Sequence, residues 1–481
     1  MISKGFIKSS LIYTLAGTLP LASAIILLPF YIENISTADY GALIIYLAVS
    51  LLIQILTTYS FDTSLYIHYH EYKKTPDKLK AFISSAFVLM LLIGGGILLL
   101  SVVVGDVAFH LFFKGKPISF FPYGLMSVAT GIFSALFKVH SNLLQSREKP
   151  EVFFWSNLGS FALIASFTIL GLELYPHSLT GPVTARLLAA LLSGGWALGR
   201  IFSEFGWHFN FALLRSSFQF NLYAFIYQLQ QWVINYFDRF VMLFFLTLND
   251  VGVYDFAIKC LLIIEFLMNG LHSSFFPKVV KIMMARDEKG TTPEVNRYYH
   301  GFTAVVMLLI CLCIFFVPPA IDLFARKADY RLAAPYIPYI GLIYIFRAMR
   351  LYFAVPYSTM KYTKPLPVIY IAVVIIKFGL MAFLLGTWRI YGVIAASLVS
   401  AVFEVLLQRY FIKGKFHYAF NSFKIIIAPI LLMLLILGVE PFVEPRYALV
   451  AHGGYLIFCV GLLWWVYRRE LKYIDPLKII R

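Results

Sequence analysis

The sequence predicts an all-α integral membrane protein with about fourteen transmembrane helices, and three observations support this fold class. Hydrophobic residues make up 60% of the 481 residues and charged residues only 13%, and the mean hydropathy is +0.81. Soluble domains carry about 25% charged residues, so this chain has too few to cover a surface in water. Apolar stretches of about 20 residues, the length that crosses a bilayer as a helix, recur along the chain. Short polar segments separate them.

The first apolar stretch follows Lys4 and Lys8 and continues to Ile32. The segment Ala22-Ser23-Ala24 within it is typical of a signal-peptide cleavage site. We nevertheless expect a transmembrane helix, because the apolar run is long enough to cross the bilayer. The later stretches meet the same criterion, and the thirteenth is the shortest. In chain order, the predicted spans are 10–32, 41–60, 81–104, 119–142, 153–173, 182–201, 218–246, 252–275, 300–324, 334–355, 367–387, 392–409, 425–439 and 448–467.

Positive side chains are distributed unevenly among the segments that connect these spans. With the N-terminus in the cytoplasm, 26 of the 40 Lys and Arg residues lie in inner segments, 7 in outer segments and 7 within spans. The positive-inside rule predicts such a bias, so we expect both termini in the cytoplasm and an even number of spans. The same rule accounts for the net charge of +16, and we do not expect nucleic acid as a partner.

The sequence lacks the motifs that indicate an enzyme or a metal site. It has no G-x-x-x-x-G-K-[ST] phosphate loop and no HExxH zinc motif. The connecting segments are at most about 25 residues long, which is too short for an extramembrane catalytic domain. We predict no catalytic residue, no metal and no cofactor. The cysteines lie in apolar runs and are expected to be small buried side chains; they are Cys260, Cys311, Cys313 and Cys459.

The two halves of the chain share landmarks in the same order. The segment TADYGALIIY matches LNDVGVYDFA, and each later landmark recurs at nearly the same separation. Each match is weak alone, but the shared order and spacing indicate an internal repeat. The matching positions are Asp39 with Asp250, Gly41 with Gly252 and Gly181 with Gly392 at a separation of 211 residues, and Lys149-Pro150 with Lys364-Pro365 at 215.

The repeat predicts two lobes of six spans each. The N-terminal lobe is expected at 1–208, the C-terminal lobe at 209–418, and an appendage of two spans with a cytoplasmic tail at 419–481. Because each lobe has an even number of spans, both enter the membrane from the same side. A pseudo-two-fold axis along the membrane normal would then relate them. A bundle of two such halves with short loops is typical of transporters.

Short stretches in both halves of the chain resemble a known family. The segments DRFVMLFFL with LNDVGVYDFAIK, ISTADYG with YSFDTSLY, and TKPLPV resemble the polysaccharide transporter branch of the multidrug/oligosaccharidyl-lipid/polysaccharide flippase superfamily. The resemblance covers the first twelve spans and implies a V-shaped cavity between two lobes in the inner (cytoplasmic) membrane. It also implies that an undecaprenyl-pyrophosphate-linked oligosaccharide, such as an O-antigen, capsule or exopolysaccharide repeat unit, is flipped to the outer leaflet by alternating access.

Two alternatives remain open at this point. The chain can instead be an exporter of drugs, or of another lipid-linked precursor such as lipid II, within the same superfamily. A site for hydrophobic cations would use carboxylates with few cations, which is the reverse of the balance in these spans. The second alternative is a membrane polysaccharide polymerase. Such enzymes usually present a large external loop, whereas the outer loops of this chain are short.

Cationic side chains within the spans are the first candidates for a cargo site. Arg347 and Lys377 lie near the bilayer midplane, from which a side chain has a long way to snorkel to the surface. Positive charge in a cavity would also offset the desolvation of a pyrophosphate. Arg186 and Lys138 lie close to span ends and are expected to snorkel. The predicted cavity residues are Arg347, Lys377, Arg350, Arg239 and Lys259.

Acidic side chains within the spans form the second group. Asp238 precedes Arg239, and Asp255 lies four residues before Lys259 on one helix face. These residues either pair to hold neighbouring helices together or act as ligand and gating groups. Two midplane glutamates are candidates for a proton or sodium coupling site, or else for ion pairs with the midplane cations. The acidic candidates are Asp238, Asp255, Glu265 and Glu404.

Overall fold

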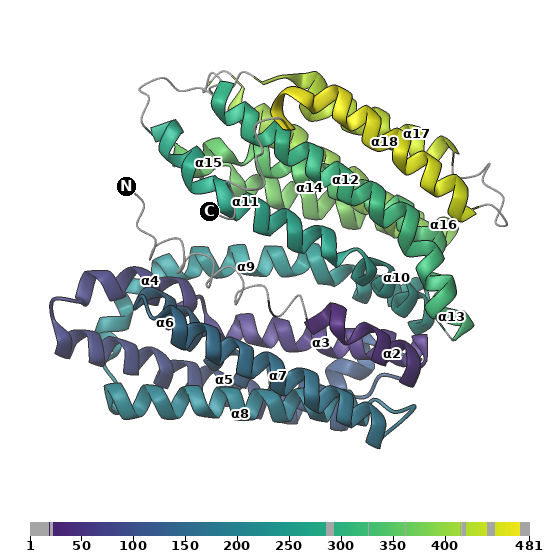
Figure 1. Cartoon of the computed structure of the whole chain (residues 1–481). Helices are drawn as coiled ribbons and strands as arrows, with labels where there is room; N and C mark the ends of the chain where they lie inside the picture. The colour runs from purple at the N-terminus through teal and green to yellow at the C-terminus, as the bar shows by residue number, and fades with distance from the viewer. Residues whose placement is uncertain are drawn as a thin grey trace. The chain divides into compact units, whose positions relative to one another are not determined.

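The regular structure of this chain is helical throughout the part that its computed structural model describes (Figure 1). That part comprises residue 19 and residues 23–284, 293–325, 327–360, 362–413, 415, 420–439 and 448–471. The predicted all-α class is therefore confirmed. About half of the first predicted span, 10–32, lies outside the described residues, as does the tail after residue 471.

The helices follow the predicted spans closely. In chain order they are α2 (Leu28–Asn34), α3 (Thr37–Thr58), α4 (Phe61–Tyr72), α5 (Pro76–Phe112), η1 (Phe120–Gly124), α6 (Leu125–Ser146), α7 (Pro150–Leu174), α8 (Thr180–Phe205), α9 (Phe211–Phe245), α10 (Leu248–Cys260), α11 (Leu262–Met284), α12 (Pro293–Phe324), α13 (Ala328–Arg331), η2 (Ala334–Tyr336), α14 (Ile337–Phe353), α15 (Val355–Thr359), α16 (Leu366–Ile412), η3 (Phe423–Ile427), α17 (Ala428–Val439) and α18 (Ala448–Leu471).

Eight helical segments of the described chain are long and apolar enough to cross a membrane. One of them, α16, is 47 residues long and holds two predicted spans. A single straight helix of that length would extend about 70 Å, whereas the hydrocarbon core of a bilayer is about 30 Å thick. Its backbone leaves the helical region at Arg389, where φ is +49°. A Cβ on Gly392 would lie 2.7 Å from the carbonyl oxygen of Leu384, so the chain folds back on itself there. The predicted turn between 387 and 392 is thus present, while the total of fourteen spans stays a prediction.

The chain divides into two compact units, Met1–Gly252 and Val253–Arg481. In the first unit, α6 packs against α3, α4, α5, α7 and α8, and α9 packs against α3, α4 and α5. In the second unit, α12 packs against α11, α14 and α18, and α14 packs against α16. The lobe boundaries 1–208, 209–418 and 419–481 rest on the sequence repeat and remain a prediction.

The first landmarks of the repeat are helix caps. Ser36 caps α3, because its hydroxyl accepts a hydrogen bond from the Asp39 backbone N–H at 3.1 Å and donates to the Asp39 carboxylate at 2.6 Å. Thr247 does the same for α10, accepting from the Asp250 N–H at 3.2 Å and donating to its carboxylate at 2.7 Å. Such reciprocal caps satisfy N–H groups that a helix start leaves unpaired. The shared motif therefore starts one helix in each repeat.

The next landmark brings these two helices into direct contact. A Cβ on Gly41 would lie 2.1 Å from the carbonyl oxygen of Leu248, and one on Gly252 would lie 1.9 Å from that of Thr37. The Thr37 hydroxyl also donates to the side-chain oxygen of Asn249. Only glycine permits this approach of the two backbones.

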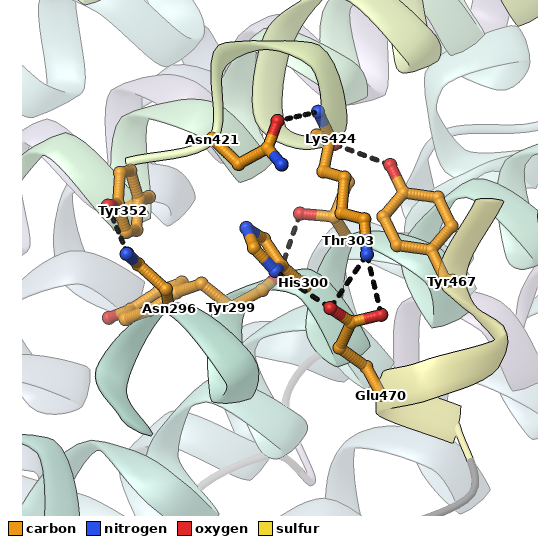
Figure 2. A network of polar contacts seen from close by, with 9 residues as sticks. All are labelled: Asn296, Tyr299, His300, Thr303, Tyr352, Asn421, Lys424, Tyr467 and Glu470. Atoms are coloured by element: carbon orange, nitrogen blue, oxygen red, sulfur yellow. Dashed lines mark hydrogen bonds and ion pairs between the residues drawn. The ribbon is translucent and has the colours of Figure 1, made fainter. Parts of the chain in front are cut away.

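Polar side chains tie the last helix of the second unit to α12 (Figure 2). Lys424 Nζ, in η3, lies 2.8 and 2.9 Å from the two carboxylate oxygens of Glu470 in α18. His300 Nδ1, in α12, lies 3.2 Å from Oε1 of the same carboxylate. Burial alone would raise the pKa of the Glu470 carboxyl. The hydrogen bonds from Lys424 and His300 outweigh this effect, so the pKa lies below its usual value. A charged network thus links α18 to η3 and to α12 within the second unit.

We predict that replacing either matched glycine by alanine separates α3 from α10. The added methyl group overlaps a backbone carbonyl oxygen, and such overpacking costs about 1–3 kcal/mol. Gly95→Ala in α5 is the matched control, because a Cβ there meets nothing within 4 Å and alanine favours a helix. The measurement is the thermal unfolding midpoint of the purified protein in detergent. Equal midpoints for Gly41→Ala, Gly252→Ala and Gly95→Ala would contradict the contact.

Candidate functional site

Two arginines on α14 form the centre of the candidate site. Arg347 and Arg350 are three residues apart and lie on the same face of the helix. Arg347 Nη1 lies 3.0 Å from Glu265 Oε2 of α11, and Arg350 Nη1 lies 3.5 Å from Glu404 Oε1 of α16. We call these four residues the α14 charge cluster. It joins three helices of the second unit within segments that are otherwise apolar.

The start of α11 explains the position of Glu265. The chain breaks between α10 and α11, and Glu265 lies in the first turn of the new helix. A negative charge in the first turn is stabilised by the helix dipole and by the unpaired N–H groups. Arg347 also lies over an aromatic ring, with its guanidinium carbon 5.2 Å from the Tyr344 centroid. Both members of this ion pair therefore have supporting contacts of their own.

Partial exposure distinguishes this cluster from a sealed ion pair. The side chains of Arg347, Glu265 and Arg350 are 29%, 31% and 31% exposed, whereas Glu404 is 9% exposed. Charged groups at this depth avoid lipid, so exposed ones indicate a polar space beside the helix. Oε1 of Glu404 is buried and has no hydrogen-bond partner among the described residues, because the contact with Arg350 is too long. This carboxylate retains the capacity to accept a proton or a cation.

The other predicted candidates lie in different surroundings. Asp238 and Arg239 in α9 are both buried and pair with each other at 2.5 Å, and Arg239 also donates to the Asn235 carbonyl oxygen. Lys377 in α16 is buried, with its ammonium 5.8 Å from the Phe378 ring centroid.

Asp255 in α10 is 1% exposed and Lys259 is half-buried. The ion pair that their spacing allows stays a prediction. No group of three or more His, Cys, Asp or Glu in the described ranges is arranged to hold a metal ion. Arg347, Arg350 and their two carboxylate partners combine predicted charges from three helices.

The first unit contains an ion pair that sequence reasoning missed. Lys138 Nζ of α6 lies 2.9 Å from Asp62 Oδ2 of α4, and Gln228 Nε2 of α9 lies 3.2 Å from Asp62 Oδ1. Lys138 thus has a counter-charge that the sequence analysis did not assign, and its predicted snorkelling to the membrane surface stays a prediction. Tyr59 and Ser60 have φ of 41° and 58°, so a left-handed break separates α3 from α4 and places Asp62 in the first turn of α4. In the sequence, the signal for this ion pair was Asp62, an acidic residue that lies two positions after the predicted span 41–60.

Comparison with known proteins identifies the fold. A family model described as "Polysaccharide biosynthesis protein" matches residues 6–283. No curated protein matches the sequence significantly. Among solved structures, the lipid II flippase MurJ in an inward closed conformation has a TM-score of 0.71 at 15% identity, over 96% of this chain and 99% of that chain.

Two further structures are multidrug transporters. An inward-facing MATE family transporter of the MOP superfamily has a TM-score of 0.61 at 13% identity, over 82% of this chain and 94% of that chain. The MATE multidrug transporter DinF-BH has a TM-score of 0.59 at 12% identity, over 85% of this chain and 95% of that chain. Identities this low show a shared fold, and this fold is that of multi-pass membrane transporters.

We predict that Asp62 and Lys138 are energetically coupled. Asp62→Asn leaves the Lys138 ammonium without its counter-charge inside the membrane, and removing one partner of a buried pair costs up to about 3–5 kcal/mol. Because Lys138 is 35% exposed, we expect a smaller loss. Adding Lys138→Met to the Asp62→Asn variant should recover part of the lost stability. The measurement is thermal unfolding of the wild type, the two single variants and the double variant. Additive effects of the two substitutions would show that the pair does not interact.

Proposed function

The chain belongs to the polysaccharide biosynthesis protein family, and from that premise we propose that it is a flippase for lipid-linked oligosaccharides. The family model covers more than half of the 481 residues, and the predicted family is confirmed. We infer that the cargo is an undecaprenyl-pyrophosphate-linked repeat unit of a surface polysaccharide. It would move from the inner to the outer leaflet of the cytoplasmic membrane by alternating access, with both termini of the chain in the cytoplasm.

The α14 charge cluster is the observation that carries this proposal. A pyrophosphate brings negative charge into the membrane and needs cationic donors that already face a polar space. Arg347 and Arg350 present such donors on one helix face and remain about a third exposed. In the proposed mechanism, the pyrophosphate competes with Glu265 and Glu404 for the two guanidinium groups. Arg239 is paired with Asp238 and Lys377 is buried, so we assign both to supporting roles.

The same cluster offers a route for ion coupling. When the pyrophosphate takes the arginines, Glu265 and Glu404 lose their counter-charges inside the membrane. A carboxylate in that position favours binding a proton or a sodium ion. Oε1 of Glu404, which is buried without a hydrogen bond among the described residues, is the atom that we assign to this step. Cargo binding and cation binding would then favour each other, and by linkage this coupling is reciprocal.

A lipid II exporter is the second candidate, and the fold similarity to MurJ favours it specifically. Both cargoes carry a pyrophosphate on a lipid, so the α14 charge cluster fits either one. A site for cationic drugs would use carboxylates with few cations nearby, whereas each carboxylate of this cluster has an arginine within 3.5 Å. Rescue of two bacterial strains, one lacking its O-antigen flippase and one depleted of its lipid II flippase, separates the two cargoes.

We predict that Arg347→Ala and Arg350→Ala each reduce surface polysaccharide about tenfold or more in the rescued strain. The loss of one charge-assisted hydrogen bond to the cargo, about 1.5–3 kcal/mol, sets this magnitude. Arg200→Ala, at the exposed end of α8, removes the same charge and should leave polysaccharide unchanged. Membrane levels are compared by immunoblot. Normal polysaccharide in the Arg347→Ala Arg350→Ala double variant would refute the role assigned to the cluster.

A further inference from the structure

The ion pair of Lys138 and Asp62 in the first unit resembles the pairs of the α14 charge cluster. The Lys138 side chain is 35% exposed and that of Asp62 is 7% exposed, close to the 31% and 9% of Arg350 and Glu404. In both pairs a nearly buried carboxylate holds a cation that is about a third exposed. A cation with this exposure can reach a ligand without first being unpacked from the helices.

The predicted repeat relates this pair to the other pair of the α14 charge cluster. Asp62 lies in the helical segment Thr37–Tyr72, which holds the second predicted span, and Lys138 lies in the fourth span. Glu265 and Arg347 lie in the eighth and tenth spans, which are the second and fourth of the predicted C-terminal lobe. In each lobe the carboxylate lies in the first turn of a helix that follows a break. The same two spans of each repeat therefore supply an acid and a cation.

The Asp62 carboxylate has other partners besides Lys138. Its Oδ1 accepts a hydrogen bond from the Thr63 backbone N–H at 3.1 Å and one from Gln228 Nε2 of α9 at 3.2 Å. The start of α4 stabilises it further, because the helix dipole favours negative charge in the first turn. The Lys138 ammonium has three N–H donors, and Asp62 is its only ion-pair partner among the described residues. The lysine can therefore turn to another anion without leaving Asp62 unsatisfied.

Polar residues mark the side of α6 on which Lys138 lies. Ser134, Lys138 and Asn142 follow one another at intervals of four residues, so they share one face of the helix, and all three are half-buried. The neighbouring Leu136 and Val139 are fully buried. A face turned to lipid would carry apolar side chains, so the polar face of α6 borders a polar space.

The depth and the charge of this site determine its ligand. Lys138 lies about two turns before the end of α6, at the end that we predict to be cytoplasmic. From there its flexible stem can carry the ammonium to the level of the inner-leaflet headgroups. A phosphate at that level suits this site, because lysine binds phosphate as a point charge. A cationic ligand would be repelled by the ammonium.

We propose that Lys138 binds the phosphate of a lipid in exchange for Asp62, and that this phosphate belongs to the pyrophosphate of the cargo. The inference rests on the proposed function, and it adds a binding group in the first unit to the α14 charge cluster of the second. A bulk anionic phospholipid offers the same phosphate chemistry, so the experiment compares the two sources.

The test is lipid binding to the purified full-length protein in detergent, measured by native mass spectrometry. Undecaprenyl pyrophosphate and phosphatidylglycerol are titrated separately. We expect Lys138→Met to weaken binding of undecaprenyl pyrophosphate about tenfold, because it removes one charge-assisted hydrogen bond. Lys149→Met, at an exposed position just beyond α6, removes the same charge and should bind like the wild type. Equal weakening of both lipids by Lys138→Met would assign the site to bulk headgroups and overturn the proposal.

Asp62→Asn distinguishes exchange from a structural ion pair, and it remains informative if Lys138→Met does not fold. A structural pair predicts that either substitution impairs binding. Exchange predicts opposite effects, because Asp62→Asn removes the competitor for the ammonium and should tighten binding of undecaprenyl pyrophosphate about threefold. Wild-type affinity in Lys138→Met, or weaker binding in Asp62→Asn, would overturn the proposal.

The Arg347→Ala Arg350→Ala double variant separates this inference from the proposed function. Weakened binding of undecaprenyl pyrophosphate in the double variant, together with wild-type affinity in Lys138→Met, would overturn this inference alone. Wild-type affinity in the double variant would instead contradict the role that the proposed function gives to the α14 charge cluster.

Discussion

Every charge inside this membrane protein must meet a counter-charge or a polar space, because a charged side chain at the bilayer centre costs about 2.5–3.5 kcal/mol or more. The described structure contains both solutions. Asp238 and Arg239 are buried and satisfy each other within one helix. Arg347 and Glu265 also pair but remain about 30% exposed, which requires a polar space next to them. That difference is the reason why we propose the α14 charge cluster, and not the pair of Asp238 and Arg239, as the cargo site.

The fold class was predictable because it depends on local patterns. Apolar length sets the spans, and the helices lie where those stretches lie. The repeat rested on Asp39, Asp250, Gly41 and Gly252, and each has a physical role in the structure. The aspartates complete the caps of α3 and α10, and the glycines allow the two helices to touch. A reciprocal cap and a close backbone contact accept few residue types, so both leave a readable pattern in the sequence.

The partners of the charges were not predictable, because side-chain contacts between distant helices leave no periodic signal. Lys138 and Arg186 look alike in the sequence, since each is a cation close to the end of an apolar span. In the structure Lys138 has Asp62 beside it, whereas Arg186 faces a pocket lined by hydroxyl groups. Only the packing of the helices distinguishes these two cases.

Water access to the α14 charge cluster is the most direct test of the account. Arg347→Cys is made in a background without the four native cysteines, and a membrane-impermeant, positively charged thiosulfonate is applied to membrane vesicles. We expect the thiol to react, the reaction to be slowed by lipid-linked oligosaccharide, and the attached cation to restore part of the transport. A thiol that reacts only after denaturation would show that the cluster is sealed within the helix packing, and would contradict a cargo site there.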